Sequence, residues 1–124
     1  WVIADRFLDS TTVYQGLGRG LDLETVQTIN HFAIGEIKPE LTILLDMDAA
    51  TGHDRAKAAS QAEGKADRME DQSVDFFERV RQGYLDLAAV ETGRMVVIDA
   101  SGTIEDVHAD IQNALKNRYD EFSA

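Results

Sequence analysis

Three short segments of the chain consist mainly of hydrophobic residues, and in none of them do polar and apolar positions alternate. They are Trp1–Ala4, Leu41–Met47 and Met95–Ile98. Continuous apolar runs of this length are typical of strands buried on both faces, as in a parallel sheet covered by helices. The segments therefore predict three parallel strands.

Hydrophobic residues recur at helical spacing between and after these segments. One stripe runs through Val74, Phe77, Val80, Tyr84 and Leu87. The order of strands and helices along the chain indicates an α/β fold built from βαβ units. Helices are expected over Asp22–Gly35, from about Gly52 to Gln61, from near Asp71 onward, and after the variant capping box that begins at Thr103.

Acidic residues stand where the expected strands end. Asp5 follows the first segment, Asp46 and Asp48 close the second, and Asp99 follows the third. Ligands of open parallel sheets bind beyond the carboxyl ends of the strands, so chemistry is expected at this edge. Asp46 and Asp48 could join a metal site, although an acid at such a position often only caps the next helix.

Composition narrows the class of protein. The chain has 124 residues, of which 44% are hydrophobic and 28% are charged, as in an ordinary globular domain or part of one. Its net charge of -11 argues against a general nucleic-acid surface. No apolar run approaches the roughly 20 residues of a membrane span. The absence of cysteine removes disulfide scaffolds and thiolate metal sites.

Two segments could carry phosphate chemistry. Asp5 could hold Mg²⁺ and Arg6 could bind a phosphate, but the same residues could form a salt-bridged pair at a sheet edge. In Ser10–Gly20, Thr11 and Gln15 could bond a base edge while Tyr14 packs on a sugar. The alternative for this segment is a glycine-rich connecting loop. No G-x-x-x-x-G-K-[ST] motif occurs in the sequence.

A third segment concentrates basic residues within the acidic chain. It runs from Arg55 to Glu70 and has a glycine, Gly64, at a position that suits a hinge. Such a segment could fold over transferred phosphates and exclude water. It could equally be a solvated helix hairpin of mixed charge.

Taken in order, these segments resemble the thymidylate kinase family, in its bacterial form. Single motifs are weak, but their order and spacing together are specific, and the similarity covers essentially the whole chain, 1–124, as the carboxyl-terminal part of one domain. The matching segments are Asp5–Phe7, Ser10–Gly16, Gly18–Gly20, Pro39–Thr42, Leu44–Asp46, Asp67–Glu70, Asp75–Phe77, Val80–Arg81, Tyr84–Ala88 and Val97–Ala100.

The resemblance implies a P-loop nucleoside monophosphate kinase fold, with a five-stranded parallel sheet flanked by helices. It implies transfer of the γ-phosphate of ATP to dTMP, giving dTDP for dTTP synthesis, with Mg²⁺. It further implies a cytoplasmic homodimer without nucleic-acid or membrane partners, to which the helix Asp22–Gly35 could contribute contacts.

Roles for individual residues also follow from the resemblance. Asp5, Arg6 and Arg68 match catalytic positions, and Asp5 lies near the metal. The segment 52–70 matches the lid. Residues that match the dTMP site are Arg6, Ser10, Thr11, Tyr14 and Gln15, and those that match the ATP site are Arg55, Lys65, Arg68, Ala100, Ser101 and Gly102.

The chain departs from the family pattern at its start. The P-loop, the first two strands, the base-stacking phenylalanine and a second phosphate arginine have no counterpart, and the first residues look like the inside of a strand. We therefore expect part of a longer enzyme, with a gap in the sheet, inactive and poorly stable alone. The lid stretch also carries fewer arginines than is usual for the bacterial form.

Three other hypotheses stay open at this point. The first is a related nucleoside or nucleotide kinase with another base preference. The second is a non-catalytic α/β module that has lost its P-loop. The third is a receiver-like signalling domain, which predicts a lysine after the last strand, where Ser101 and Gly102 stand instead.

Overall fold

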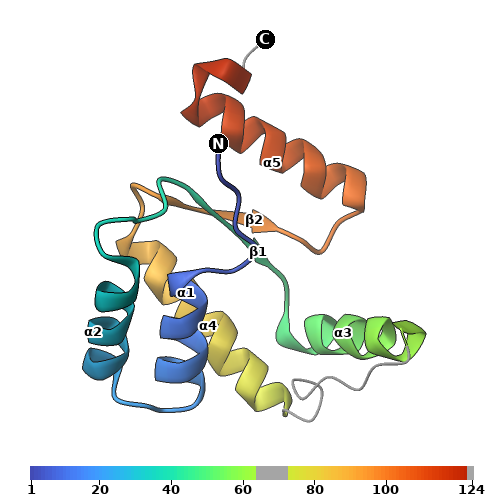
Figure 1. Ribbon diagram of the computed structural model, residues 1–124. Coiled ribbons are helices and arrows are strands. Elements are labelled where there is room, and N and C mark those ends of the chain that lie inside the picture. The colour runs from blue at the N-terminus through green and yellow to red at the C-terminus, as the bar shows by residue number, and fades with distance from the viewer. Residues whose placement is uncertain (64–72, 123–124) are drawn as a thin grey trace.

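The computed structural model describes residues 1–63 and 73–122 of the chain. Its sheet consists of β1 (Thr42–Asp46) and β2 (Met95–Asp99), which pair in parallel (Figure 1). The register places Asp46 opposite Asp99, so these two acids share one edge of the sheet. Two of the three predicted strands are thus confirmed, as is the parallel pairing.

The prediction of a strand at Trp1–Ala4 is wrong. This segment has no regular structure and is exposed to solvent; the exposed fractions of Val2 and Ile3 are 94% and 95%. A strand needs a hydrogen-bonded neighbour, and no backbone hydrogen bond joins this segment to β1 or β2. Trp1 instead packs edge-on against Tyr119, with 4.8 Å between ring centres. Over the described residues, the implied five-stranded sheet is two-stranded.

Side-chain caps fix where the helices begin. Asp22 caps α2 (Leu23–Ile34), which ends at Gly35 with a φ of +58°. Ser73 caps α4 (Val74–Val90), because its hydroxyl accepts from the amide of Phe76. The capping box of α5 (Ile104–Arg118) is confirmed. Two further elements are α3 (Ala49–Glu63) and a 3₁₀ turn, η2 (Asp120–Phe122).

The glycine-bearing stretch is helical, so a connecting loop is the wrong interpretation. It forms α1 (Leu8–Thr11) and continues as a π-helix, η1 (Thr12–Gly18). Packing against α4 outweighs the low helix propensity of glycine. A Cβ on Gly18 would lie only 3.0 Å from Val80 Cγ2, so glycine here permits close approach of the two helices.

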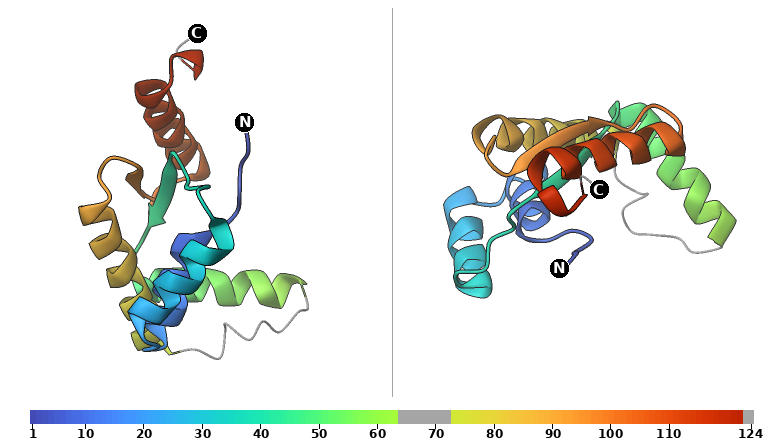
Figure 2. Two further views of the ribbon diagram at one scale, coloured as in Figure 1. Left: turned by 60° about the vertical axis from the view of Figure 1, so that its left-hand side comes forward. Right: turned by 90° about the horizontal axis from the view of Figure 1, so that it is seen from above.

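The helices lie on both sides of the small sheet (Figures 1 and 2). Helix α5 covers one side, and α1, α2 and α4 lie on the other. The buried core is formed by Val13, Phe76 and Val80, where η1 meets α4. Tyr14 and Tyr84 pack against this core, which therefore holds both tyrosine rings in place. In the described ranges, no helix has both the length and the hydrophobicity required to cross a membrane.

Candidate functional site

A pocket of about 430 Å³ lies between the α1–η1 helix and α2. The structure brings the five predicted substrate-binding residues together in its wall, although the sequence only placed them in one stretch. We call it the Arg6 pocket. Its lining consists of Arg6, Ser10, Thr11, Tyr14 and Gln15, together with Phe7, Leu8, Asn30, Ala33 and Ile34.

Arg6 is held at the pocket by two contacts. Its Nε donates a hydrogen bond to Ser10 Oγ at 3.1 Å, and its guanidinium carbon lies 4.5 Å from the centre of the Tyr14 ring. Its terminal nitrogens have no acceptor within the described ranges, and the residue is exposed. An arginine in this state can offer its planar fork to an incoming phosphate or carboxylate.

The backbone of Arg6 is unusual. Its φ is +65°, the one positive value for a residue other than glycine within residues 1–63 and 73–122. Such a conformation costs about 1–3 kcal/mol, and it persists where surrounding contacts impose it. Strain of this kind is common at binding sites, and here it falls on the residue predicted to bind phosphate.

The hydroxyl of Ser10 joins the pocket to α4. Ser10 Oγ lies 2.8 Å from the phenol oxygen of Tyr84. Burial raises the pKa of the Tyr84 phenol above its ordinary value, so the hydroxyl remains protonated at neutral pH. The Tyr84 ring also meets the Tyr14 ring edge-on, with 6.2 Å between centres.

A buried ion pair fixes α1 against the sheet. Both carboxylate oxygens of Asp9 accept hydrogen bonds from Arg94, each at 2.8 Å, and both side chains are less than a tenth exposed. Thr42 at the start of β1 completes the group by donating to Asp9. Sequence reasoning missed these residues. A charged residue directly before a buried strand, as Arg94 is, needs a partner, and that signal could have identified it.

A second missed contact ties α2 to α1. Asn30 is buried, and its amide nitrogen donates to Thr12 Oγ1 at 2.8 Å and to the carbonyl of Leu8 at 3.2 Å. Because Asn30 also lines the Arg6 pocket, these bonds set the distance between the two pocket walls.

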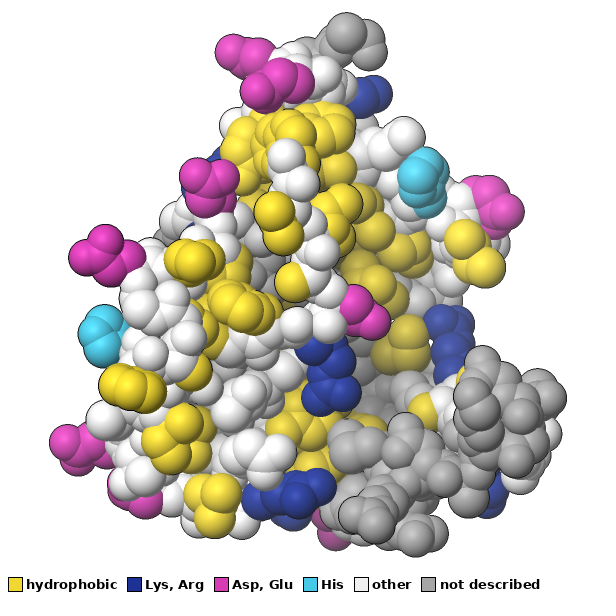
Figure 3. All heavy atoms as spheres, viewed as in Figure 1, with side chains coloured by type: hydrophobic (Ala, Val, Ile, Leu, Met, Phe, Trp, Pro, Cys, Tyr) yellow, Lys and Arg dark blue, Asp and Glu magenta, His cyan; other side chains and the backbone are white. Residues whose placement is uncertain are grey.

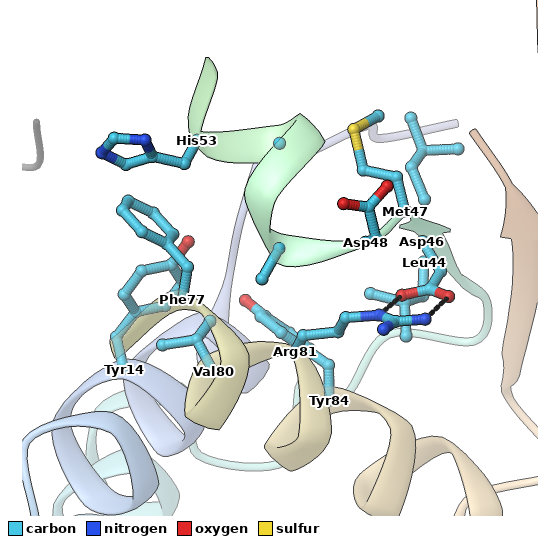
Figure 4. Close-up of a pocket in the computed structure, with 13 residues that line it drawn as sticks. Tyr14, Leu44, Asp46, Met47, Asp48, His53, Phe77, Val80, Arg81 and Tyr84 are labelled. Atoms are coloured by element: carbon cyan, nitrogen blue, oxygen red, sulfur yellow. Dashed lines mark hydrogen bonds and ion pairs between the residues drawn. The ribbon is translucent and has the colours of Figure 1, made fainter. Parts of the chain in front are cut away.

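Another pocket, of about 240 Å³, opens between the end of β1, α3 and α4 (Figure 4). Asp46 is paired there with Arg81 through two hydrogen bonds of 2.8 and 3.0 Å. Asp48 caps α3, because its Oδ1 accepts from the amide of Thr51, and this bonding lowers the pKa of Asp48. The capping interpretation is therefore confirmed for Asp48, whereas Asp46 is engaged in the ion pair.

The residues predicted to contact ATP are partly brought together. Arg55 on α3 donates to the carbonyl oxygen of Ala100 at 3.1 Å, which joins α3 to the loop after β2. Ser101 and Gly102 continue that loop, and the Ser101 amide donates to Asp99 Oδ1 at 2.8 Å. Lys65, Arg68 and the lid beyond residue 63 lie outside the described residues.

Asp5, the predicted metal ligand, is exposed beside Arg6. Across the described ranges, no three His, Asp or Glu side chains group in a metal-binding arrangement. Acidic side chains on the face shown in Figure 3 lie mostly along its rim, while Lys and Arg lie toward its middle and lower part. The overall negative charge therefore does not extend evenly over this face.

Comparison with known proteins decides the family. The family model described as thymidylate kinase matches residues 1–111. The chain belongs to the thymidylate kinase family. The predicted resemblance is thereby confirmed, and a receiver-like domain is not the family that the chain matches.

The chain is also similar in sequence to curated proteins named thymidylate kinase. The chain is 44% identical to that of Kosmotoga olearia over 110 residues, which cover 89% of the chain and 51% of the relative. It is 45% identical to the thymidylate kinase of Desulforapulum autotrophicum, and the match covers 94% of the chain and 53% of that relative. It is 44% identical to the thymidylate kinase of Geobacter sulfurreducens, and that match covers 94% of the chain and 56% of the relative. The chain thus spans about half the length of the curated relatives it matches.

Proposed function

We propose that this chain forms the dTMP-binding side of a thymidylate kinase, which transfers the γ-phosphate of ATP to dTMP and yields dTDP and ADP. The observation that carries the proposal is the Arg6 pocket, where all five residues predicted to bind dTMP share one wall. Membership of the family supplies the substrate class.

The geometry suits each part of the nucleotide. The free guanidinium nitrogens of Arg6 would bind the 5′-phosphate, because charge-assisted bonds to arginine are strong and planar. Tyr14 would pack on the sugar, while Thr11 and Gln15 would hydrogen-bond the base. Phosphoryl transfer depends on positioning and on offsetting charge rather than on a covalent nucleophile, so an arginine beside hydrogen-bonding side chains suits it.

ATP and Mg²⁺ would occupy the neighbouring edge of the sheet. Arg55, with the loop from Ala100 to Gly102, would contact the adenine side of ATP. Mg²⁺ in such enzymes is held by one or two carboxylates together with phosphate and water oxygens. The exposed Asp5 fits as one carboxylate ligand, and the bound ion would offset phosphate charge.

The test is binding of dTMP to the 124-residue chain, measured by isothermal titration calorimetry. We expect Arg6→Ala to weaken binding at least tenfold, because the phosphate loses a charge-assisted partner. Arg118→Ala is the matched control, since it removes the same charge from an exposed position on α5. Failure of the unaltered chain to bind dTMP, or equal affinity in the Arg6 variant, would refute the proposal.

A transfer assay complements the binding measurement. Because the 124 residues contain no G-x-x-x-x-G-K-[ST] motif, we expect the chain alone to bind dTMP without forming dTDP from ATP. Chromatography of the nucleotides would measure this. Formation of dTDP at a rate proportional to chain concentration would show that another segment supplies the phosphate cradle.

We also propose a homodimer formed through α2. Phe32 and Ile29 lie three residues apart on this helix and are 90% and 59% exposed. Large apolar side chains exposed together are characteristic of interfaces. Sedimentation should show self-association that Phe32→Ser reduces, with Thr28→Ser as a mild control on the same helix. Identical sedimentation of the chain and the Phe32 variant would argue against this surface.

A further inference from the structure

We infer that Tyr84 is a positioning residue for Arg6 and so sets affinity for the phosphate of the bound nucleotide. This inference rests on the proposed function. Tyr84 lies on α4, 74 residues from Ser10 in sequence, and it does not line the Arg6 pocket. Its influence would therefore pass through Ser10.

Two hydrogen bonds that share one oxygen connect α4 to the pocket. Tyr84 Oη lies 2.8 Å from Ser10 Oγ, and the same Ser10 oxygen accepts from Arg6 Nε at 3.1 Å. A serine oxygen has two lone pairs, so it can take part in both bonds at once. Because Ser10 binds Nε, the two terminal nitrogens of Arg6 remain available to a ligand.

Arg6 needs such support more than an ordinary surface arginine does. Its backbone has a φ of +65°, and its side chain is exposed. A free arginine side chain loses up to about 2 kcal/mol of rotational entropy when it is fixed. Fixing the guanidinium before the ligand arrives removes part of this cost from binding.

Tyr84, at the α4 end of this connection, is held rigidly. Tyr84 packs against the core formed by Val13, Phe76 and Val80. Its neighbour Gly83 brings α4 so close to η1 that a Cβ there would meet Leu17 Cδ1 at 2.8 Å. The phenol is therefore held at a fixed place, and its hydroxyl can define where Ser10 points.

The test compares dTMP with thymidine, which lacks the phosphate. Tyr84→Phe keeps the ring and removes only the hydroxyl. We expect it to weaken dTMP binding about five- to tenfold and to leave thymidine binding unchanged, because Arg6 serves the phosphate alone. Tyr119→Phe, which removes a phenol hydroxyl from a residue that does not line the pocket, should change neither affinity.

A second measurement does not require a ligand. The Nε–H signal of Arg6 in the nuclear magnetic resonance spectrum should shift and exchange faster with water in Tyr84→Phe. In a Ser10→Ala background, Tyr84→Phe should have no further effect on dTMP affinity, because the connection is already broken.

The outcomes separate the two proposals. If the unaltered chain does not bind dTMP, the proposed function fails and the inference fails with it. If Arg6→Ala weakens dTMP binding but Tyr84→Phe leaves both the affinity and the Arg6 signal unchanged, only the inference fails. Equal losses for dTMP and thymidine would indicate a general structural role and would also overturn it.

Discussion

The pair of Asp9 and Arg94 shows how single residues determine the geometry of the Arg6 pocket. Asp9 precedes Ser10 directly, so anchoring its carboxylate to Arg94 also fixes the start of the pocket wall. Arg94 contacts Thr42 as well, and Glu91 accepts from its Nε at 3.1 Å. The hydrogen bonds and charge of Asp9, and then those of Glu91, raise the pKa of Arg94 above its ordinary value, so it is charged at neutral pH.

Removing one charge of this pair should destabilise the fold strongly. Asp9→Asn keeps the shape of the side chain but leaves Arg94 buried without its partner charge. We expect a loss of about 3 kcal/mol in the free energy of unfolding, measured by urea denaturation. Asp86→Asn, which alters an exposed acid on α4, is the control and should cost less than about 1 kcal/mol.

The double variant Asp9→Leu with Arg94→Met separates the net value of the pair from the cost of an unpaired charge. Replacing a buried pair by apolar residues is often close to neutral. We therefore expect the double variant to be more stable than Asp9→Asn. If the Asn variant unfolds at the same urea concentration as the unaltered chain, the pair does not anchor α1.

Local sequence identified the pocket residues but not the residues that hold them. Arg6, Ser10, Thr11, Tyr14 and Gln15 lie close together in sequence, and the order and spacing of the motifs that contain them pointed to one site. Tyr84 and Arg94 act through partners 74 and 85 residues away, and spacing along the chain carries no sign of such contacts. Only the packing of α1 against α4 and the sheet brings them together.

At the scale of elements, predictions succeeded where the local pattern and the tertiary packing agree. The helices after Asp22 and Thr103 begin at the predicted caps, and the two paired strands lie where the apolar runs predicted them. The prediction failed at Trp1–Ala4, which has no pairing partner among the described residues. At Ser10–Gly20 the sequence left a connecting loop open as an alternative, and contact with α4 instead makes residues up to Gly18 helical despite their glycines.

The caps make helix stability depend on pH in a predictable direction. Hydrogen bonds from threonine side chains and amides lower the pKa of Asp22, Asp48 and Asp106 below 3.8. A carboxylate with a lowered pKa in the folded state stabilises it at higher pH, and this contribution is lost as pH falls through the folded-state value. Circular dichroism during urea unfolding should show stability falling below about pH 4.

The capping variant Asp106→Asn checks the source of this effect. It removes the titrating carboxylate of the α5 capping box, so its stability should be lower than that of the unaltered chain at pH 7 and should change less between pH 5 and pH 3. Asp110→Asn, on the same helix but away from the cap, should keep the full pH dependence. Identical pH profiles for the chain and Asp106→Asn would exclude the cap as the cause.

The contact between η1 and α4 makes a further prediction at this scale. In Gly18→Ala, the new Cβ would lie 3.0 Å from Val80 Cγ2 and 3.1 Å from Phe76 Cε2. Overpacking costs about 1–3 kcal/mol, which exceeds the gain of up to about 1 kcal/mol in helix propensity. Urea unfolding should therefore show a net loss. Gly93→Ala, with nothing within 4 Å of its Cβ, should lose nothing.

The whole molecule exposes more surface than a compact protein of its mass. Its accessible surface is 8771 Å², whereas a compact monomer of 13.7 kDa would expose roughly 6,600 Å². The excess is partly apolar, since Trp1, Val2, Ile3 and Phe32 are each at least 75% exposed. The main buried cluster lies at the junction of η1 and α4, and over residues 1–63 and 73–122 the sheet has two strands. We therefore expect the stability of the isolated chain to be low.

This open surface should be directly measurable. We expect the isolated chain at neutral pH to retain its helical circular dichroism while increasing the fluorescence of anilinonaphthalene sulfonate, which binds accessible apolar surface.

We also expect urea to unfold the chain at a low midpoint concentration, because little apolar area is buried to offset conformational entropy. Saturating dTMP should raise that midpoint, since binding only to the folded state stabilises it. Unchanged dye fluorescence together with sharp unfolding above about 5 M urea would contradict the open arrangement of Trp1–Ala4 and α2.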